Sequence, residues 1–422
     1  PQRSNKLVFM SRSILPEPPG ELKQHSRRLT ERILEAIRGE GCIPFSRYME
    51  MALYEPGLGY YAAGLHKLGK SGDFTTAPEL GPLFAACLAR QASQIGARLG
   101  EYDVLEIGAG TGQLAIDFLS NLPDEAEPCS YRILERSADL RDVQKKRIEQ
   151  EIPQWADRVC WLDKPPSEAW QGLLIANEVI DALAVERFEV NGPSIDRLCV
   201  ADSGGVLDWA RAPAPDRLET AVQHIESYIG RTLEDGYRSE VQLQLPAWLQ
   251  AVSRHMARGL ALFIDYGHPR DEYYRPERTD GTLMCHFRHQ AHDDPFFWPG
   301  LQDLTAWVDF TALAEAADAC ELDVEGYSSQ AMFLLGCGLE QVLQDQVSKS
   351  DDGGVALGAQ ARQLSQPGMM GEKFQVRGRG RGRDFDPRGF SLLDLSYRRK
   401  PPFAQREGGC RTGCPSGPQC RY

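Results

Sequence analysis

The sequence lacks any apolar run of the roughly 18 residues that a membrane-spanning helix needs, and its start lacks the apolar segment of a signal peptide. It also lacks a net positive charge, since 47 Lys and Arg residues stand against 60 Asp and Glu residues, for a formal net charge of −13. Without a basic field to neutralise phosphates, general nucleic-acid binding is disfavoured, although a local basic patch would still fit. The sequence therefore predicts neither a membrane span nor a nucleic-acid partner.

Closely spaced cysteine pairs are lacking as well. Eight of the 11 cysteines are scattered singly, and the other three fall after residue 399 without Cys-x-x-Cys spacing or nearby histidines. His286, His289 and His292 follow one another at intervals of three, on a strand-to-loop path where they would not converge on one ion. The sequence therefore predicts no metal site, and reduced cysteines as in an intracellular protein.

Residues 102–119 are the most informative stretch that is present. A short apolar run leads into three alternating glycines, which include Gly108 and Gly110, and then into apolar residues at helical spacing. This predicts a buried strand, a tight loop and a helix. A dinucleotide-binding loop would need a third glycine where Gln113 stands, and Glu106 suits a cationic or hydroxyl-rich ligand better than a pyrophosphate. The Glu-x-Gly-x-Gly pattern is typical of S-adenosyl-L-methionine (SAM) binding in Rossmann-like methyltransferases; the alternative is an ordinary glycine-rich turn.

The next two predicted strands end in further candidate contacts to the cofactor. Glu135 follows the apolar residues 131–134, and an acid at the tip of the second strand of a Rossmann-type sheet accepts hydrogen bonds from ribose hydroxyls. Leu162 and Asp163 end the predicted strand 158–162, where the edge of an adenine is expected.

The fourth predicted strand, within residues 172–177, ends in Asn177, Glu178 and Asp181. Ligands of open α/β sheets bind beyond the carboxyl ends of the strands, so these polar side chains are expected to face the site. The alternative is that Glu178 and Asp181 only cap a following helix.

A loop ahead of the glycine-rich stretch is a further candidate. Gly72, Asp73 and Phe74 precede Thr76 and Glu79, whose spacing predicts a capping box at the start of a helix that runs to about residue 98. Such a loop could close over a bound nucleoside, or it could be a plain capped loop.

The predicted organisation has four parts. Residues 1–20 are expected to be a disordered or non-native leader, 21–100 an N-terminal helical cap with a SAM-covering loop, 101–398 the core, and 399–422 a disordered tail. Alternating strands and one helix predict an antiparallel β insertion at about 186–245. The Arg-Gly run that ends at Arg383 is expected to be a solvated turn rather than an RNA-binding segment.

With these segments placed, the sequence resembles the MidA family of SAM-dependent methyltransferases, which includes bacterial proteins and a mitochondrial complex I assembly factor that methylates arginine. The resemblance runs from about residue 43 to 398 and rests on eight motifs in the expected order. These motifs lie at residues 43–61, 72–79, 106–112, 177–183, 264–267, 281–283, 302–310 and 371–374. The sequence departs from the family pattern in the Arg-Gly run and in the tail.

The resemblance implies an α/β fold: a Rossmann-like SAM methyltransferase core with an N-terminal helical cap and an antiparallel β insertion. It also implies that Gly72, Asp73 and Phe74 lie around SAM together with the glycine-rich loop and Glu135. The expected activity is metal-independent methyl transfer, with an arginine of a protein as acceptor, in a respiratory-complex subunit or another protein.

In methyl transfer the enzyme mainly aligns the reactants and accepts a proton. Glu178 is the candidate for holding the acceptor, with Asp181 as its helper and Asn177 orienting the acceptor. A non-catalytic SAM-binding assembly or scaffold protein is the main alternative, and a nicotinamide oxidoreductase is disfavoured by Gln113. The start shows no convincing presequence, which favours a bacterial cytoplasm, or the mitochondrial matrix if the source is eukaryotic.

Overall fold

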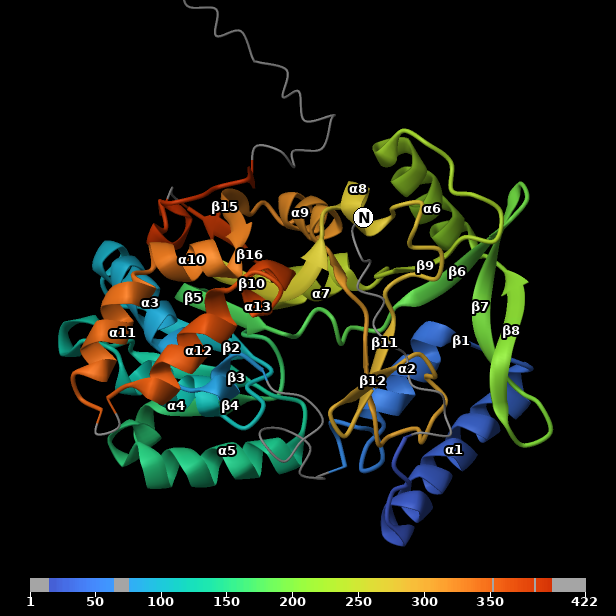
Figure 1. The fold of residues 1–422 in the computed structure, drawn as a ribbon, viewed down its shortest axis with the longest axis horizontal. Coiled ribbons are helices and arrows are strands. Elements are labelled where there is room, and N and C mark those ends of the chain that lie inside the picture. Colours follow the sequence, from blue (N-terminus) through green and yellow to red (C-terminus); the bar gives the residue numbers. More distant parts are fainter. Residues whose placement is uncertain (1–14, 64–75, 351–352, 383–384, 397–422) are drawn as a thin grey trace, which may run out of the picture.

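A computed structural model describes residues 15–63, 76–350, 353–382 and 385–396 of the chain (Figure 1). The candidate residues Gly72, Asp73 and Phe74 and the predicted tail lie outside these ranges, as does most of the predicted leader. Leu15, within that leader, is buried in a small apolar cluster with Phe287 and Leu301. Within the described ranges, no helix combines the length and apolar character needed to cross a bilayer.

The centre of the molecule is an eight-stranded sheet in the order β15-β16-β10-β5-β2-β3-β4, with β14 paired to β10. Its strands are β2 (Asp103–Ile107), β3 (Ser130–Leu134), β4 (Val159–Leu162), β5 (Trp170–Asn177), β10 (Met256–His268), β14 (Val308–Asp309), β15 (Asp323–Ser329) and β16 (Phe374–Arg381). The strands β4, β3, β2, β5 and β10 pair in parallel. The strand order reverses between β2 and β5, so the carboxyl ends of these two strands flank a natural ligand crevice. The predicted α/β class and Rossmann-like core are confirmed.

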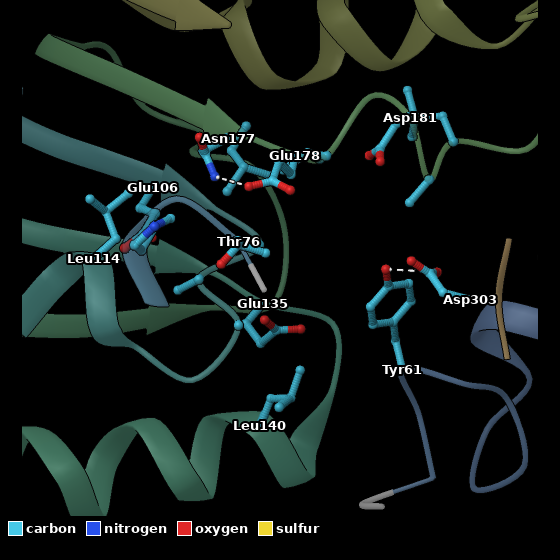
Figure 2. A pocket seen from close by; sticks show the side chains of 18 of the residues that line it. Tyr61, Thr76, Glu106, Leu114, Glu135, Leu140, Asn177, Glu178, Asp181 and Asp303 are labelled. Carbon is cyan, nitrogen blue, oxygen red and sulfur yellow. Dashed lines mark hydrogen bonds between the residues drawn. The ribbon is translucent and has the colours of Figure 1, made fainter. Parts of the chain in front are cut away.

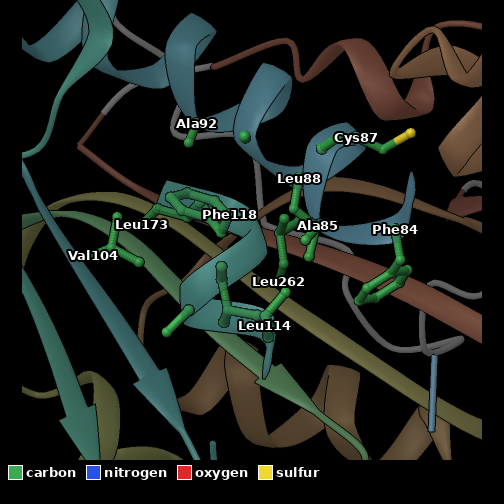
Figure 3. Packing of buried hydrophobic residues seen from close by; sticks show 14 of the residues in the cluster. Phe84, Ala85, Cys87, Leu88, Ala92, Val104, Leu114, Phe118, Leu173 and Leu262 are labelled. Carbon is green, nitrogen blue, oxygen red and sulfur yellow. The ribbon is translucent and has the colours of Figure 1, made fainter. Parts of the chain in front are cut away.

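Apolar residues fill both faces of this sheet. Val104, Leu173 and Leu262 lie in one core cluster, beneath α3 (Leu83–Leu99) and α4 (Gln113–Ser120), as Figure 3 shows. Their neighbours along the strands belong to a second cluster on the opposite face, under α7 (Leu245–Ser253) and α9 (Phe310–Ala319). Successive side chains of a strand point to opposite faces, which is why the short apolar runs of the sequence supply two cores. Burial of one large apolar side chain contributes about 1.5–3 kcal/mol.

Other helices cover the remaining surfaces. Further helices and 3-10 turns are α5 (Ala138–Glu151), α8 (Arg270–Tyr273), α10 (Gln330–Gly336), α11 (Leu339–Val347), α12 (Val355–Ser365), α13 (Met370–Lys373), η1 (Pro78–Leu80), η2 (Asp124–Ala126), η3 (Pro153–Arg158) and η4 (Arg388–Phe390). The helices α10, α11 and α12, orange in Figure 1, lie on the same face of the sheet as α3.

A second, antiparallel sheet forms from the predicted insertion. Its order is β1-β7-β6-β9, with β8 on the far side of β7. The elements are β1 (Ile43–Pro44), β6 (Glu186–Asn191), β7 (Ser194–Asp202), β8 (Leu207–Pro213), α6 (Asp216–Ile229) and β9 (Arg238–Val241). The sheet packs against α1 (Gly20–Glu40) and α2 (Phe45–Tyr54), which confirms the cap helices and the antiparallel insertion as structural elements.

The cap differs from the expected organisation in one detail. The α3 helix, which the sequence assigned to the cap, packs on the central sheet instead, so the boundary at residue 100 stays a prediction. Outside the cap and the insertion, residues 284–287 form β11 (Met284–Phe287). It joins β12 (Gln290–His292) and β13 (Asp303–Thr305) in a separate three-stranded sheet.

The Arg-Gly run is not a solvated turn, and that prediction is wrong. Residues 377–381 of the run lie in β16, which pairs antiparallel with β10 and β15, and Arg379 is fully buried. Its guanidinium donates to an Asp318 carboxylate oxygen (2.7 Å) and to the Ala314 carbonyl (2.8 Å). On the other face, a Cβ at Gly378 would meet the Phe390 ring at 2.5 Å. The charged heads of Arg379 and Arg381 are tolerated because they find acceptors, and Gly378 leaves room for the aromatic ring.

Candidate functional site

A cavity of about 1810 Å³ opens at the carboxyl ends of the parallel strands. Figure 2 shows acidic side chains facing it from several elements. The predicted site residues that line it are Glu106, Gly108, Gly110, Glu135, Asp163, Asn177, Glu178 and Asp181. Leu162 packs instead against the apolar core that contains Leu105 and Phe263. The strand order thus brings together residues that are up to 75 positions apart, counted from Glu106 to Asp181.

The glycine-rich loop connects β2 to α4 along one side of the cavity. Gly108 has φ +67°, a left-handed conformation, and its amide donates to the Leu134 carbonyl (3.0 Å). A Cβ at this position would lie 3.2 Å from Cγ2 of Val179. The loop therefore needs glycine both for its backbone conformation and for the closeness of the neighbouring segment.

Gln144, on α5, holds this loop in place and was not singled out from the sequence. Its buried amide nitrogen donates to the Gly110 carbonyl (2.8 Å) and to Oε2 of Glu135 (3.3 Å), while its oxygen accepts from Nε1 of Trp161 (2.8 Å). One side chain thereby connects the loop, the tip of β3 and β4. The available signal was its position four residues before Ile148, on the apolar face of a helix.

Glu106 and Glu135 are both buried at strand ends. The Tyr131 hydroxyl donates to Oε2 of Glu106 (2.8 Å), and burial raises the pKa of Glu106 to about 8. The Ser137 amide donates to Oε1 of Glu135 (2.9 Å), whose pKa is also raised by burial. Carboxylates fixed in this way are suited to accept hydrogen bonds from hydroxyls and to pair with a positive group.

The segment ahead of α3 contacts the loop in a way that the sequence did not predict. The expected capping box is wrong, because α3 begins at Leu83 with Pro82 at its N-cap position, and neither Thr76 nor Glu79 caps it. Oε1 of Glu79 instead accepts a hydrogen bond from the Thr111 hydroxyl (2.5 Å). Thr76 and Glu79 both line the cavity, so this segment forms part of the site.

Glu178 lies beyond the tip of β5 in an unusual backbone conformation. Its φ is +55°, which is rare for a residue with a side chain and costs free energy. Its Oε1 accepts hydrogen bonds from the Asn177 side-chain amide (3.2 Å) and the Ala77 amide (3.3 Å). Burial, together with the charge of Asp181, raises the pKa of Glu178 to about 8. Strain and a raised pKa at one cavity-lining carboxyl group are typical of functional sites.

Asp181 lies three residues further along the same segment. Burial raises its pKa to about 6, although a hydrogen bond with the Tyr266 side chain opposes this. The alternative that Glu178 and Asp181 cap a helix is wrong, because residues 178–185 form turns that lead into β6. Asp265 supports these turns instead, since its Oδ2 accepts from the amides of Ile180 (3.0 Å) and Asp181 (3.3 Å).

The site residues also fit SAM. Two buried carboxylates and a closely approaching backbone match a ligand with ribose hydroxyls and a positive charge, as SAM has. Asp163, at the end of β4, is exposed at the rim and pairs with Arg141.

Comparisons with known proteins agree with this geometry. Residues 83–328 match a family described as S-adenosyl-L-methionine-dependent methyltransferases. A member of the COG1565 superfamily from Burkholderia thailandensis, crystallised with S-adenosyl-homocysteine, is 38% identical. It superposes with a TM-score of 0.84 over 91% of this chain and 100% of its own.

Curated relatives are more distant in sequence but similar in extent. The mitochondrial protein arginine methyltransferase NDUFAF7 of Mus musculus is 28% identical over 94% of this chain and 91% of its own length. Its homolog in Drosophila melanogaster is 28% identical over 85% of this chain and 88% of its own length.

The family match covers more than half of the chain, and the solved relative spans almost all of it. Both agree with the sequence motifs and with the arrangement of the cavity. The chain therefore belongs to the MidA-like family of SAM-dependent methyltransferases and is itself a SAM-dependent methyltransferase.

Proposed function

We propose that this methyltransferase acts on an arginine side chain of a protein. The observation that carries the proposal is a group of buried carboxyl groups: Glu178 and Asp181 line the cavity, and Asp265 accepts hydrogen bonds from the backbone of the same segment. Besides burial, the charge of Asp181 raises the pKa of Glu178, and the charges of Asp181 and Glu178 raise that of Asp265, so a cation that enters the cavity is favoured. A guanidinium is a permanent cation with five N–H donors and suits such a site. The relatives named as protein arginine methyltransferases support the same acceptor.

SAM supplies a methyl group that its sulfonium already activates. The residues of the chain then have three tasks: to align the acceptor nitrogen, to hold the acceptor's charge and to take up its proton. Glu178 is the proposed contact to the acceptor nitrogen, since Asn177 and the Ala77 amide fix its carboxyl group. Asp181 assists by its charge, and Asn177 orients the acceptor.

The cofactor-binding residues are likewise proposed. Glu106, Gly108, Gly110 and Glu135 would hold SAM, because they line the cavity at the tips of β2 and β3. Asp163 and Leu162 would lie near the adenine. Gly72, Asp73 and Phe74 stay a prediction from the family resemblance.

One proposed substrate is a subunit of a respiratory complex, because the resembled family includes a complex I assembly factor. The curated relatives are named mitochondrial. For this chain we propose the bacterial cytoplasm, or the mitochondrial matrix if the source is eukaryotic.

The function is tested with SAM labelled in its methyl group. The purified protein is incubated with this SAM and a lysate from cells that lack the protein, and the labelled bands are hydrolysed to amino acids. We expect a discrete band whose label elutes as methylarginine. SAM binding without any labelled band would support a scaffold protein instead, and label on another amino acid would refute the arginine acceptor.

Replacing Gln144 with Leu should weaken SAM binding on the order of 10-fold while the fold is retained. The substitution keeps the side-chain volume, but the Gly110 carbonyl and Glu135 lose their shared donor. Calorimetric titration with SAM measures the effect. The matched control is Gln150→Leu, an exposed position on the same helix, which should bind as the wild type does. Equal affinities for the two variants would contradict the role of Gln144.

A further inference from the structure

Tyr61 and Asp303 form a second polar group on the far side of the cavity. Tyr61 follows α2 in the cap, and Asp303 begins β13, 242 residues later in the chain. The Tyr61 hydroxyl donates to Oδ1 of Asp303 (3.0 Å), and both residues line the cavity. In Figure 2 the pair lies near Asp181 and away from Glu106, which belongs to the cofactor side.

Aromatic rings hold this pair in position. Tyr54 stacks on Tyr61 with ring centroids 5.6 Å apart and an interplanar angle of 24°. The Tyr54 hydroxyl donates to the Ala182 carbonyl (3.2 Å), so the cap is hydrogen-bonded to the segment that carries Asp181. Tyr54 also contacts a cation, since the guanidinium of Arg136 lies 4.7 Å from the centroid of its ring. The tyrosine surface is therefore compatible with a planar cation.

The charge of Asp303 acts on Glu178 across the cavity. The negative charge of Asp303 contributes to the raised pKa of Glu178 and to that of Tyr61. Asp181 is only 4% exposed and lines the cavity, yet its Oδ1 has no hydrogen-bond partner among the described residues. A buried carboxylate oxygen without a donor is costly, and a ligand that supplies N–H groups would remove that cost.

We propose that Asp303, oriented by Tyr61, is a specificity-determining residue that binds the acceptor guanidinium together with Asp181. This inference rests on the proposed arginine acceptor and extends it. A guanidinium presents N–H groups on more than one edge of a plane, so it can meet Glu178 on one edge and Asp181 and Asp303 on another. An ammonium is a compact point charge and cannot span these groups. The site would therefore select arginine over lysine.

The test measures binding of two small probes to the full chain loaded with S-adenosylhomocysteine. The probes are N-acetyl-arginine methylamide and N-acetyl-lysine methylamide, titrated by NMR or calorimetry. The wild type should prefer the arginine probe. Asp303→Asn should weaken the arginine probe on the order of 10-fold and leave the lysine probe and S-adenosylhomocysteine unchanged. Tyr61→Phe should weaken the arginine probe by a smaller factor.

Asp208→Asn, at an exposed position of β8, is the matched control and should bind both probes as the wild type does. S-adenosylhomocysteine affinity reports whether each variant is folded. Asp303→Asn that binds the arginine probe as tightly as the wild type would overturn the inference and leave the proposed function intact. A wild type that does not prefer the arginine probe would overturn both. If Asp303→Asn loses S-adenosylhomocysteine binding, the deciding variant is Asp303→Glu. Because Asp303→Glu retains a carboxylate, it should keep part of the preference for the arginine probe. Loss of that preference in Asp303→Glu would count against the inference.

Discussion

Replacing Glu178 with Gln should lower the single-turnover rate of methyl transfer by about 100-fold or more, with SAM affinity unchanged within about twofold. The amide keeps the shape of the side chain but cannot hold a cationic acceptor or take up its proton. The cofactor contacts proposed at β2 and β3 do not involve this residue. Rapid-quench measurement with labelled SAM gives the rate, and calorimetry gives the affinity. Glu372→Gln, at an exposed position on the same cavity, is the control and should transfer normally.

The same substitution should stabilise the fold at alkaline pH. Burial raises the pKa of Glu178 from 4.5 to about 8, so the folded protein holds a proton there that the unfolded chain has released. Because the unfolded chain releases this proton as the pH rises from about 4.5 toward 8, the free energy of unfolding falls progressively over that range. Each unit of pKa difference corresponds to about 1.4 kcal/mol, and a glutamine does not incur this cost. The melting temperature of Glu178→Gln should exceed that of the wild type by several degrees at pH 8 and approach it near pH 4.5. Equal melting temperatures of the wild type and Glu178→Gln at pH 8 would contradict the raised pKa. Equal transfer rates would contradict the role of Glu178 in methyl transfer.

Replacing Gly108 with Val should abolish detectable SAM binding, a loss of about 100-fold or more. Valine is β-branched and disfavours φ +67°, and its Cβ would lie 3.2 Å from Val179 before its two methyl groups are added. The loop must shift, and the backbone that should approach the cofactor shifts with it. Calorimetric titration with SAM and with S-adenosylhomocysteine measures the loss.

The control for Gly108→Val is the same substitution at a glycine with positive φ that lies outside the cavity. Gly192 has φ +55° in the exposed turn between β6 and β7, and a Cβ there would meet nothing within 4 Å. Gly192→Val should therefore lower the melting temperature without changing SAM affinity. Unchanged SAM affinity in Gly108→Val would exclude the glycine-rich loop from the cofactor site.

The parts that the sequence predicted are those governed by local chemistry. Apolar runs bounded by polar or glycine residues predicted the parallel strands, and strand order then placed Glu106, Glu135 and Glu178 at one edge, as expected for a sheet of this class. The strands within residues 186–245 could also be predicted, because alternating apolar and polar side chains indicate a half-buried sheet.

The parts that were missed depend on partners far away in the chain. The Arg-Gly run looked solvent-exposed because its composition is polar, but acceptors on α9 and the packing of Phe390 and Glu325 against its glycines make it a buried strand. Thr76 and Glu79 had the spacing of a cap, yet Glu79 contacts Thr111. Gln144 and Asp303 gain their roles only when β3, β4, β13 and the cap meet around one cavity.

The most direct test of the whole account is a crystal structure of this chain with S-adenosylhomocysteine. The account predicts that the ribose hydroxyls meet Glu135, that the backbone at Gly108 lies against the ligand, and that the sulfur faces Glu178 across the cavity. A ligand bound with its sulfur turned away from Glu178, or bound elsewhere in the cavity, would contradict it.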